Sequence, residues 1–402
     1  MELKEIAKKH ALKNAFDYGQ AQPGGVVGKV IADCPEAKID MKATMKLIGQ
    51  TVAEVNGMTK EAIAAEMKNF EYAEHAQREG LPDLEGFEGK PANTRFAPNP
   101  SGFMTIGHSK VAVLCDEYSK KYPGKFWLRF DDTDPKTKKP LPEAYAQTEE
   151  DVKWLGCAIA GVIMQSERMS IYYDYAERLL KEGKAYVCTC TKEVLQDNRK
   201  EGEACPCRER AGGLGEWKKM QETYGDGDAV LRLKTDLSHP NSSVRDWVMF
   251  RIIQEPHPMA GTKYRVWPLY NFASAVDDHE FGITLIIRGK EHELNGIKQD
   301  MLYDAFGWER PRVLVVGILK ASEEFAHKTD IRNAIASGAL SGWDDPRAPT
   351  VMGFRKRGVP AAAIRAYVIS SGIGNTDSSL DVKKLESFAR KIEAAEQAAP
   401  AA

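Results

Sequence analysis

The sequence predicts an α/β fold in which a parallel sheet of the dinucleotide-binding (Rossmann) type is divided into two halves. Strand-like and helical segments alternate over residues 94–185 and again over residues 283–317. Alternation of this kind is typical of parallel strands joined by right-handed helical crossovers. A polar stretch that contains cysteines, residues 186–264, interrupts the alternation and therefore predicts an inserted subdomain.

Composition limits the class of protein. The chain has 402 residues, of which 43% are hydrophobic and 28% charged, and its formal net charge is -2. These values are ordinary for a globular protein of about two to three domains, and the charge gives no evidence of a nucleic-acid partner. No apolar run is long enough for a signal peptide or a membrane span, so we expect a cytoplasmic protein without membrane contact. The oligomeric state stays open.

The chain begins with a helical segment over residues 1–88, which has Pro and Gly breaks such as Gln22-Pro23-Gly24-Gly25. Residues 89–185 then form the first half of the sheet domain, where short apolar runs bounded by turn residues alternate with amphipathic stretches. The elements expected in this half are strands over 94–97 and 125–130 and helices over 107–120, 143–156 and 170–183.

The second half of the sheet domain covers residues 265–320. Beyond it the pattern is helical over residues 321–392, and EAAEQAAPAA at 393–402 is a low-complexity segment that predicts a disordered tail. The strands and the helix expected in the second half and in the insertion are, in chain order, a strand over 229–235, a strand over 283–289, a helix over 297–306 and a strand over 313–317.

Four of the seven cysteines cluster in the insertion. They form Cys188-Thr-Cys190 and Cys205-Pro-Cys207, with fourteen residues between the pairs. Four thiolates suit tetrahedral Zn²⁺ with no open position, so we expect a structural zinc site. The Cys-x-Cys spacing is tighter than the commoner zinc-finger spacing, and ordinary reduced cysteines remain the alternative.

The turn between the first strand and the first helix of the sheet domain predicts a nucleotide site. RFAPNPSGFMTIGH leads from Arg95 through Pro98 and Pro100, which forbid a continuing helix, to a helix that starts near Gly107. The unpaired backbone N–H groups of a helix start favour a phosphate. Ligands of such folds bind at the carboxyl ends of the strands.

This segment resembles the ATP signature of class I aminoacyl-tRNA synthetases, usually His-Ile-Gly-His, in the form Thr105-Ile106-Gly107-His108. KFWLRFDDTDP, VWPLYNFASAVDDH, IIRGKEHELN and GWDDPR follow in the order found in archaeal-type glutamyl-tRNA synthetases. The resemblance covers nearly the whole chain and stops where that family's anticodon-binding β-barrel begins. It implies a Rossmann catalytic domain with an inserted acceptor-binding subdomain. The implied activity is that of a glutamate-tRNA ligase, which uses ATP and Mg²⁺ to form glutamyl-adenylate and transfers glutamate to the 3′ end of tRNA.

The resemblance also implies which residues bind ATP. His108 donates to the phosphates, and Gly107 leaves room for the adenine. Thr105 stands where the family has its first histidine; its hydroxyl can still donate one hydrogen bond but cannot carry charge. We expect His108, Thr105 and the lysine of the second signature to be the catalytic residues.

The second signature, Lys-Met-Ser-Lys-Ser in general form, falls on residues 325–331 in an ungapped match. Lys328 keeps a lysine that can hold the leaving pyrophosphate. His327 replaces the serine of the signature, and Asp330 stands where a basic residue is common. The negative charge of Asp330 would repel a triphosphate.

Four residues match the amino-acid pocket of the family. Arg95 is the arginine that contacts a substrate carboxylate, Asp131 is the acid for the α-ammonium, and Tyr270 lines the pocket. Arg288 falls where glutamyl enzymes have an arginine for the side-chain carboxylate and glutaminyl enzymes have a neutral residue. Two guanidinium groups suit an amino acid with two carboxylates.

Arg347, Arg355 and Arg357 resemble the region of the family that meets the inner side of the tRNA, although such a charge run is otherwise typical of a solvated helix face. Two other functions remain open. The first is a shortened paralog that activates glutamate for another acceptor. The second is a catalytically weakened synthetase that only binds tRNA or a partner. The departures from both signatures favour these alternatives.

Overall fold

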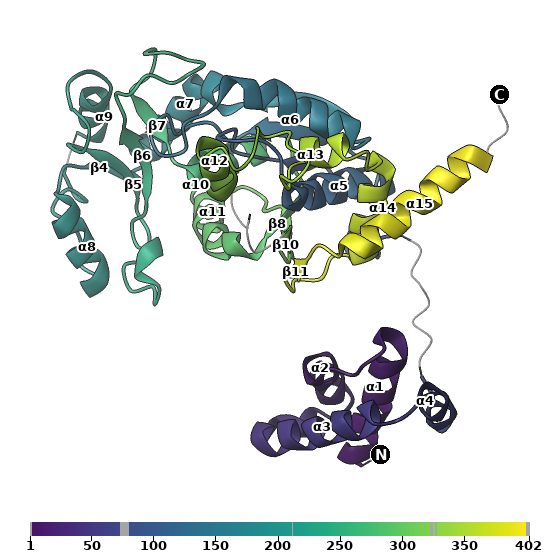
Figure 1. The fold of residues 1–402 in the computed structure, drawn as a ribbon. Helices are drawn as coiled ribbons and strands as arrows, with labels where there is room; N and C mark the ends of the chain where they lie inside the picture. The colour runs from purple at the N-terminus through teal and green to yellow at the C-terminus, as the bar shows by residue number, and fades with distance from the viewer. Residues whose placement is uncertain (1, 73–79, 211, 322–324, 326–327, 399–402) are drawn as a thin grey trace. The chain divides into compact units, whose positions relative to one another are not determined.

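A computed structural model describes residues 2–72, 80–210, 212–321, 325 and 328–398 (Figure 1). The chain divides into two compact units, Met1–Arg78 and Glu79–Ala402. The sequence-predicted boundary at residue 88 lies later than this division, because Leu81, Leu84 and Phe87 pack into the core of the second unit.

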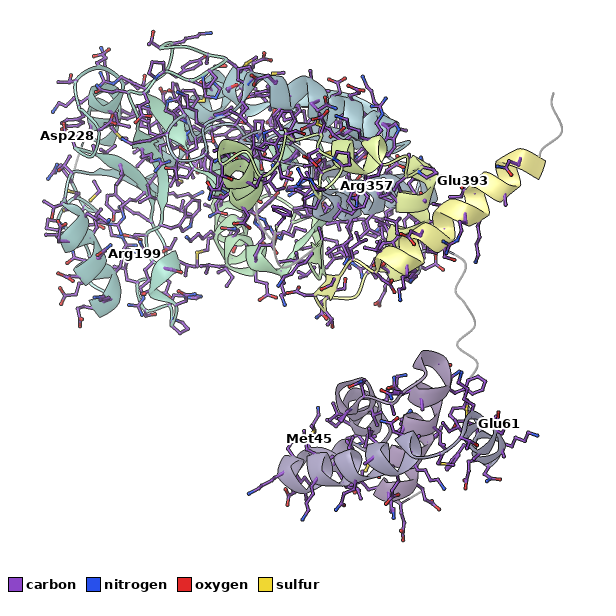
Figure 2. The ribbon with its side chains drawn as sticks, in the orientation of Figure 1. Met45, Glu61, Arg199, Asp228, Arg357 and Glu393 are labelled. Atoms are coloured by element: carbon purple, nitrogen blue, oxygen red, sulfur yellow. The ribbon has the colours of Figure 1, made fainter. Side chains whose placement is uncertain are left out.

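The first unit is helical, as predicted. Its core is built from apolar side chains at helical spacing on the first three helices, including Leu12, Val26 and Ile48. Met45 lies on the exposed side of the third helix (Figure 2). The helices are α1 (Leu3–Tyr18), α2 (Pro23–Asp33), η1 (Pro35–Lys38), α3 (Met41–Asn56) and α4 (Lys60–Met67).

The second unit is built on the predicted parallel sheet. The first half has the strand order β1-β2-β3, all parallel, and the second half is the parallel pair β8-β9. The two halves meet at β1 and β8, where the N–H groups of Thr284 and Leu285 donate to the carbonyl of Asn93 at 3.0 and 3.1 Å. The strands are β1 (Thr94–Phe96), β2 (Phe126–Phe130), β3 (Ile159–Met164), β8 (Leu285–Gly289) and β9 (Arg312–Val316).

The helix that follows β1 is buried over most of its length, because it packs against β1 and β8 and also against a helix from the C-terminal region. Its side chains Val113, Leu114 and Tyr118 join Leu128 and Ile287 in one core. The helices of the two halves are α5 (Ile106–Lys121), α6 (Pro142–Trp154), η2 (Gln165–Glu167), α7 (Met169–Lys181), α10 (Tyr270–Glu280), η4 (Lys290–His292) and α11 (Glu293–Phe306).

The insertion forms an antiparallel sheet with the strand order β4-β5-β6-β7. Its core is continuous with α7, α10 and α11, as the ring of Phe250 shows by lying 4.6 Å from that of Phe272 on α10. The insertion therefore packs on the helix that carries part of the candidate site. Its elements are β4 (Ala185–Cys188), α8 (Lys192–Glu201), α9 (Gly213–Glu222), β5 (Val230–Leu233), η3 (Ser242–Val244), β6 (Val248–Ile252) and β7 (Val266–Pro268).

The C-terminal region is mainly helical, as predicted, but the disordered tail expected over 393–402 is wrong for residues 393–398. The last helix continues to Ala398, since the Ala and Glu residues of the low-complexity segment are also strong helix formers. Residues 399–402 lie outside the described part. Within the described part, no helix combines the length and apolarity needed to cross a membrane. The elements are β10 (Leu319–Lys320), α12 (Lys328–Ala336), α13 (Val351–Lys356), α14 (Ala361–Ser371), β11 (Ser378–Ser379) and α15 (Val382–Ala398).

Candidate active site

The first signature lies at the start of α5. Nδ1 of His108 accepts the backbone N–H of Thr105 at 3.1 Å and lies 3.0 Å from the Thr105 hydroxyl oxygen. Because an accepting Nδ1 leaves the proton of a neutral imidazole on Nε2, His108 can present Nε2–H as a donor. Burial, assisted by the charge of Lys328, lowers the pKa of His108 to about 3, so the ring is neutral near pH 7.

Gly107 is required by the fold as well as by the signature. A Cβ at this position would lie 2.7 Å from the carbonyl oxygen of Leu319 on β10. The same helix start is tied to the C-terminal region, because the N–H of Ile106 donates to the carbonyl of Pro349 at 3.0 Å. The first signature therefore contacts two segments, at Leu319 and at Pro349, that lie more than two hundred residues later in the chain.

Lys328 reaches the loop of the first signature. Its Nζ donates to the carbonyl oxygens of Gly102 at 3.0 Å and Asn99 at 3.3 Å. Burial, with the nearby charges of Lys138 and Arg332, lowers the pKa of Lys328 to about 8. The segments predicted to be the two ATP signatures therefore meet at one loop. His327 lies outside the described residues, and Asp330 lies in the first turn of α12.

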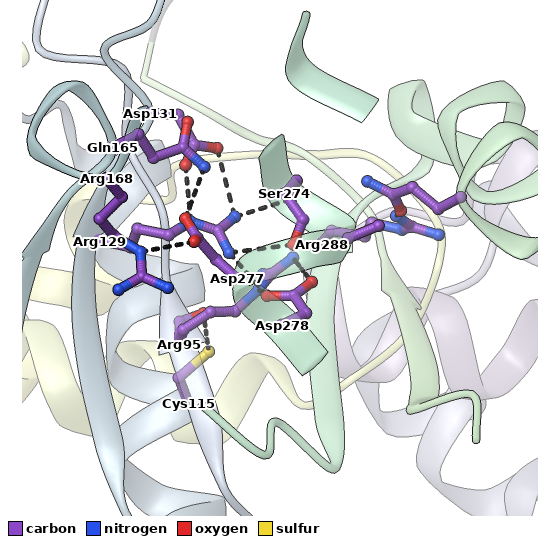
Figure 3. A network of polar contacts seen from close by, with 12 residues as sticks. Arg95, Cys115, Arg129, Asp131, Gln165, Arg168, Ser274, Asp277, Asp278 and Arg288 are labelled. Atoms are coloured by element: carbon purple, nitrogen blue, oxygen red, sulfur yellow. Dashed lines mark hydrogen bonds and ion pairs between the residues drawn. The ribbon is translucent and has the colours of Figure 1, made fainter. Parts of the chain in front are cut away.

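A buried polar network joins two of the amino-acid candidates, Arg95 and Asp131, through Arg129 and Asp278 (Figure 3). Arg129 on β2 is 1% exposed and donates to Asp131, to Asp278 and to the hydroxyl of Ser274, each at 2.7 Å. Arg95 donates to the same Asp278 through Nε at 3.0 Å and Nη2 at 3.3 Å. Asp278 is thus shared by two arginines, and it joins the two halves of the sheet domain.

The two acids of this network differ in their electrostatics. Burial alone would raise the pKa of Asp278, but Arg95 and Arg129 lower it below its usual value. Burial raises the pKa of Asp131 to about 6 in spite of the same two arginines. Asp278 is therefore a permanent counter-ion, whereas Asp131 changes its charge within an accessible pH range.

Asp277, the neighbour of Asp278 on α10, fixes that helix from the opposite side. It accepts from Nε of Arg168 at 2.8 Å, from the Tyr172 hydroxyl at 2.7 Å and from Nε2 of Gln165 at 3.0 Å. Three donors for one buried carboxylate stabilise the charge and hold α10 in place.

Sequence reasoning missed Arg129, Asp277 and Asp278, although all three lie inside segments that carry the family resemblance. The available signal was the pair of adjacent acids that directly follows the small and apolar residues Ala273 to Val276, because acids in a buried segment need cationic partners.

Tyr270 is the first residue of α10, and its pKa reflects the other candidate pocket residues. Burial, followed by the charge of Asp131, raises the pKa of its phenol, and Arg95 and Arg288 act on it in the opposite direction. The phenol therefore lies within electrostatic reach of the other three residues predicted for the amino-acid pocket. Arg288, at the end of β8, is 7% exposed and donates from Nη1 to Oε1 of Gln299 at 2.7 Å.

The four cysteines of the insertion converge. Their Sγ atoms all lie within 4.8 Å of one another, with separations of 3.3 Å for Cys188 to Cys205, 3.3 Å for Cys190 to Cys205 and 3.8 Å for Cys190 to Cys207. Tetrahedral Zn²⁺ with Zn–S bonds of about 2.3 Å needs sulfur atoms about 3.8 Å apart. The donor set and its spacing therefore fit zinc.

The three arginines considered for RNA contact lie around α13. Nε and Nη2 of Arg347 donate to the two carboxylate oxygens of Asp345 at 3.0 and 2.8 Å. Arg355 pairs with Glu150 at 2.6 Å. The guanidinium of Arg357 (Figure 2) lies 3.8 Å from the centre of the Phe354 ring. These contacts hold the three side chains on the surface around one short helix.

Comparisons with known proteins show the family of this chain. A glutamate-tRNA ligase of Thermococcus kodakarensis is 44% identical over 97% of this chain and 70% of its own length, and one of Archaeoglobus fulgidus is 42% identical over 97% of this chain and 72% of its own. The fold is that of a glutamate-tRNA ligase structure from Elizabethkingia meningosepticum, solved in complex with its amino acid, with a TM-score of 0.55 and 22% identity over 78% of this chain and 74% of that one. The model of the catalytic domain of class I tRNA synthetases (E and Q) matches residues 91–392. The chain therefore belongs to the class I tRNA synthetases for glutamate and glutamine.

Proposed function

We propose that this protein is a glutamate-tRNA ligase. Within a family that serves glutamate and glutamine, the observation that carries the choice is Arg288. It is a buried guanidinium at the pocket, and its Nε has no acceptor among the residues that the structure describes. A cation of this kind favours a ligand carboxylate over a neutral amide. The relatives at 42–45% identity carry the same activity in their names.

In this proposal each end of glutamate is bound by a different residue. Arg288 receives the side-chain carboxylate, and Tyr270 lines the space between it and Asp131. Asp131 in its ionised form accepts the α-ammonium. Arg95 uses Nε and Nη2 for Asp278, so Nη1 is the part of its guanidinium that meets a substrate carboxylate. Arg129 does not touch substrate; it holds Asp131 and Asp278 at fixed positions.

Activation joins the α-carboxylate of glutamate to the α-phosphorus of ATP, and pyrophosphate leaves. The phosphate charge that grows in the transition state is met by Nε2–H of His108 and by the ammonium of Lys328, both placed by the loop after β1. The Thr105 hydroxyl adds a shorter, uncharged donor. Mg²⁺, which this family uses with ATP, supplies further charge neutralisation.

The insertion and α13 serve the RNA. The insertion, ordered by a structural zinc on Cys188, Cys190, Cys205 and Cys207, receives the acceptor end of tRNA. Arg347, Arg355 and Arg357 contact backbone phosphates. In the absence of RNA, Asp345 and Glu150 form ion pairs with Arg347 and Arg355. Phosphate binding therefore exchanges one ion pair for another and is sensitive to salt.

Glutamate-dependent exchange of pyrophosphate into ATP, measured with and without total tRNA, tests the proposal. We expect exchange with glutamate, little with glutamine, and glutamate attached to the 3′ end of tRNA. Exchange without any tRNA charging would favour another acceptor. Absence of exchange in the presence of tRNA would favour a protein that only binds RNA or a partner.

A further inference from the structure

Arg288 is held by a glutamine that belongs to none of the signatures. Gln299 on α11 is 3% exposed, and its Oε1 accepts from Nη1 of Arg288 at 2.7 Å. A guanidinium has donors only, so this contact fixes the orientation of the amide. Oε1 must face Arg288, and Nε2 must face away from Nη1.

Arg288 and Gln299 each have one buried hydrogen-bond donor without an acceptor. Nε of Arg288 and Nε2 of Gln299 have no acceptor among the residues that the structure describes. Buried donors without acceptors are costly and uncommon, so two of them on contacting side chains point to an acceptor that arrives with a ligand. A carboxylate, whose two oxygens only accept, has the required chemistry.

One helical turn before Gln299, the backbone leaves space for the same guanidinium. A Cβ at Gly296 would lie 2.6 Å from Nη2 of Arg288, a distance that real Cβ atoms do not show. Arg288 is buried and tied at Nη1, so its guanidinium would have to leave this position to accommodate a side chain. Gly296 and Gln299 therefore define the location of Arg288 from one face of α11.

We propose that Gln299 and Gly296 are positioning residues that give Arg288 its selectivity for glutamate over glutamine, an inference that rests on the proposed function. Gln299 is neutral, so it holds the guanidinium without cancelling its charge. The γ-carboxylate of glutamate then meets a guanidinium that has its full positive charge and donors in fixed positions. The side-chain amide of glutamine would bring an NH₂ group toward these same donors.

Binding of non-hydrolysable adenylate analogues tests the inference without requiring turnover. The full chain is titrated calorimetrically with the sulfamoyl analogue of glutamyl-adenylate and with its glutaminyl counterpart, and the ratio of the two affinities is the readout. Gln299→Glu pairs with Arg288 and repels a ligand carboxylate. We expect it to lower the affinity for the glutamyl analogue at least about tenfold and to change that for the glutaminyl analogue less than about threefold. Gln299→Leu removes the contact without adding charge, and should lower the ratio by about tenfold.

Gly296→Ala separates positioning from folding. Alanine favours a helix interior over glycine, which offsets part of the cost of displacing the guanidinium, so the variant should stay folded with a thermal midpoint near that of the parent while the selectivity ratio falls. Gln196→Glu, the same chemical change at an exposed site on α8, is the matched control and should leave the ratio unchanged. An unchanged ratio in both Gln299→Glu and Gly296→Ala would overturn the inference and leave the proposed function standing. A parent protein that binds both analogues equally would overturn the glutamate assignment itself.

Discussion

Replacing Arg129 by methionine should destabilise the second unit strongly. Arg129 is 1% exposed and donates to Asp131, Asp278 and Ser274 at 2.7 Å each. Arg129→Met therefore leaves the buried carboxylate of Asp131 without a cationic partner, whereas Asp278 keeps Arg95. Removing one partner of a buried ion pair typically costs about 3–5 kcal/mol. We expect a loss of this size in the free energy of unfolding at pH 7, and loss of glutamate binding with it.

Tryptophan fluorescence in a urea titration measures this change selectively. The seven tryptophans all lie between residues 127 and 343, so the signal reports on the second unit alone. Arg390→Met is the control, because Arg390 is exposed and its nearest acid, Glu386, is 4.0 Å away. Removal of an exposed pair of this kind should cost less than about 1 kcal/mol.

The pH dependence provides a second test of the same reasoning. The parent holds the pKa of Asp278 below its usual value, so the stability from this carboxylate is present at pH 7 and is lost as pH falls below about 4. In Arg129→Met the unpaired Asp131, whose pKa is already raised to about 6 in the parent, can instead take up a proton, so the deficit relative to the parent should shrink between pH 7 and pH 5. A deficit below about 1 kcal/mol at pH 7 would show that the network does not carry the energy assigned to it.

Four further outcomes are expected. Cys205→Ser should remove the metal, and elemental analysis should give about one zinc per chain in the parent and much less in the variant. Exchange activity should fall above about pH 8 as Lys328, with its pKa lowered to about 8, loses its proton, and Lys328→Arg should extend the active range upward. Affinity for the glutamyl analogue should fall below about pH 6, where Asp131 becomes neutral, and Asp131→Asn should flatten that profile. Gly107→Ala should cost about 1–3 kcal/mol of stability in urea, because its Cβ would lie 2.7 Å from the carbonyl oxygen of Leu319.

The sequence predicted the elements whose signals are local. The turn before α5 could be predicted because prolines and glycines restrict or permit backbone conformations within a few residues. The cysteine pairs could be predicted from their spacing. β3 was missed. It is a short run that contains Gly161, where a Cβ would lie 2.6 Å from the Trp127 ring, so its place depends on a neighbouring strand.

The buried network was beyond sequence reasoning for a different reason. Arg129 and Asp278 are separated by 149 positions, and Arg95 and Asp278 by 183, so only the folded chain shows that one carboxylate serves both arginines. The family resemblance named Arg95 as a substrate contact. It did not reveal that two of the donors of this guanidinium are committed to the protein.

The same network explains how the insertion can affect a pocket to which it contributes none of the four predicted residues. The insertion shares a core with α10, which carries Asp278. It also contacts the segment that follows β2, because Nε2 of His257 lies 2.7 Å from the carbonyl oxygen of Asp132, while Nδ1 accepts the N–H groups of Met259 and Ala260 at 3.1 Å each. An accepting Nδ1 makes Nε2 the donor, so the contact has a defined direction. Asp132 directly follows Asp131, so the insertion packs against both segments that carry the acids of the network. If the insertion binds the acceptor end as proposed, these contacts connect the RNA site to the segments that carry both acids held by Arg129.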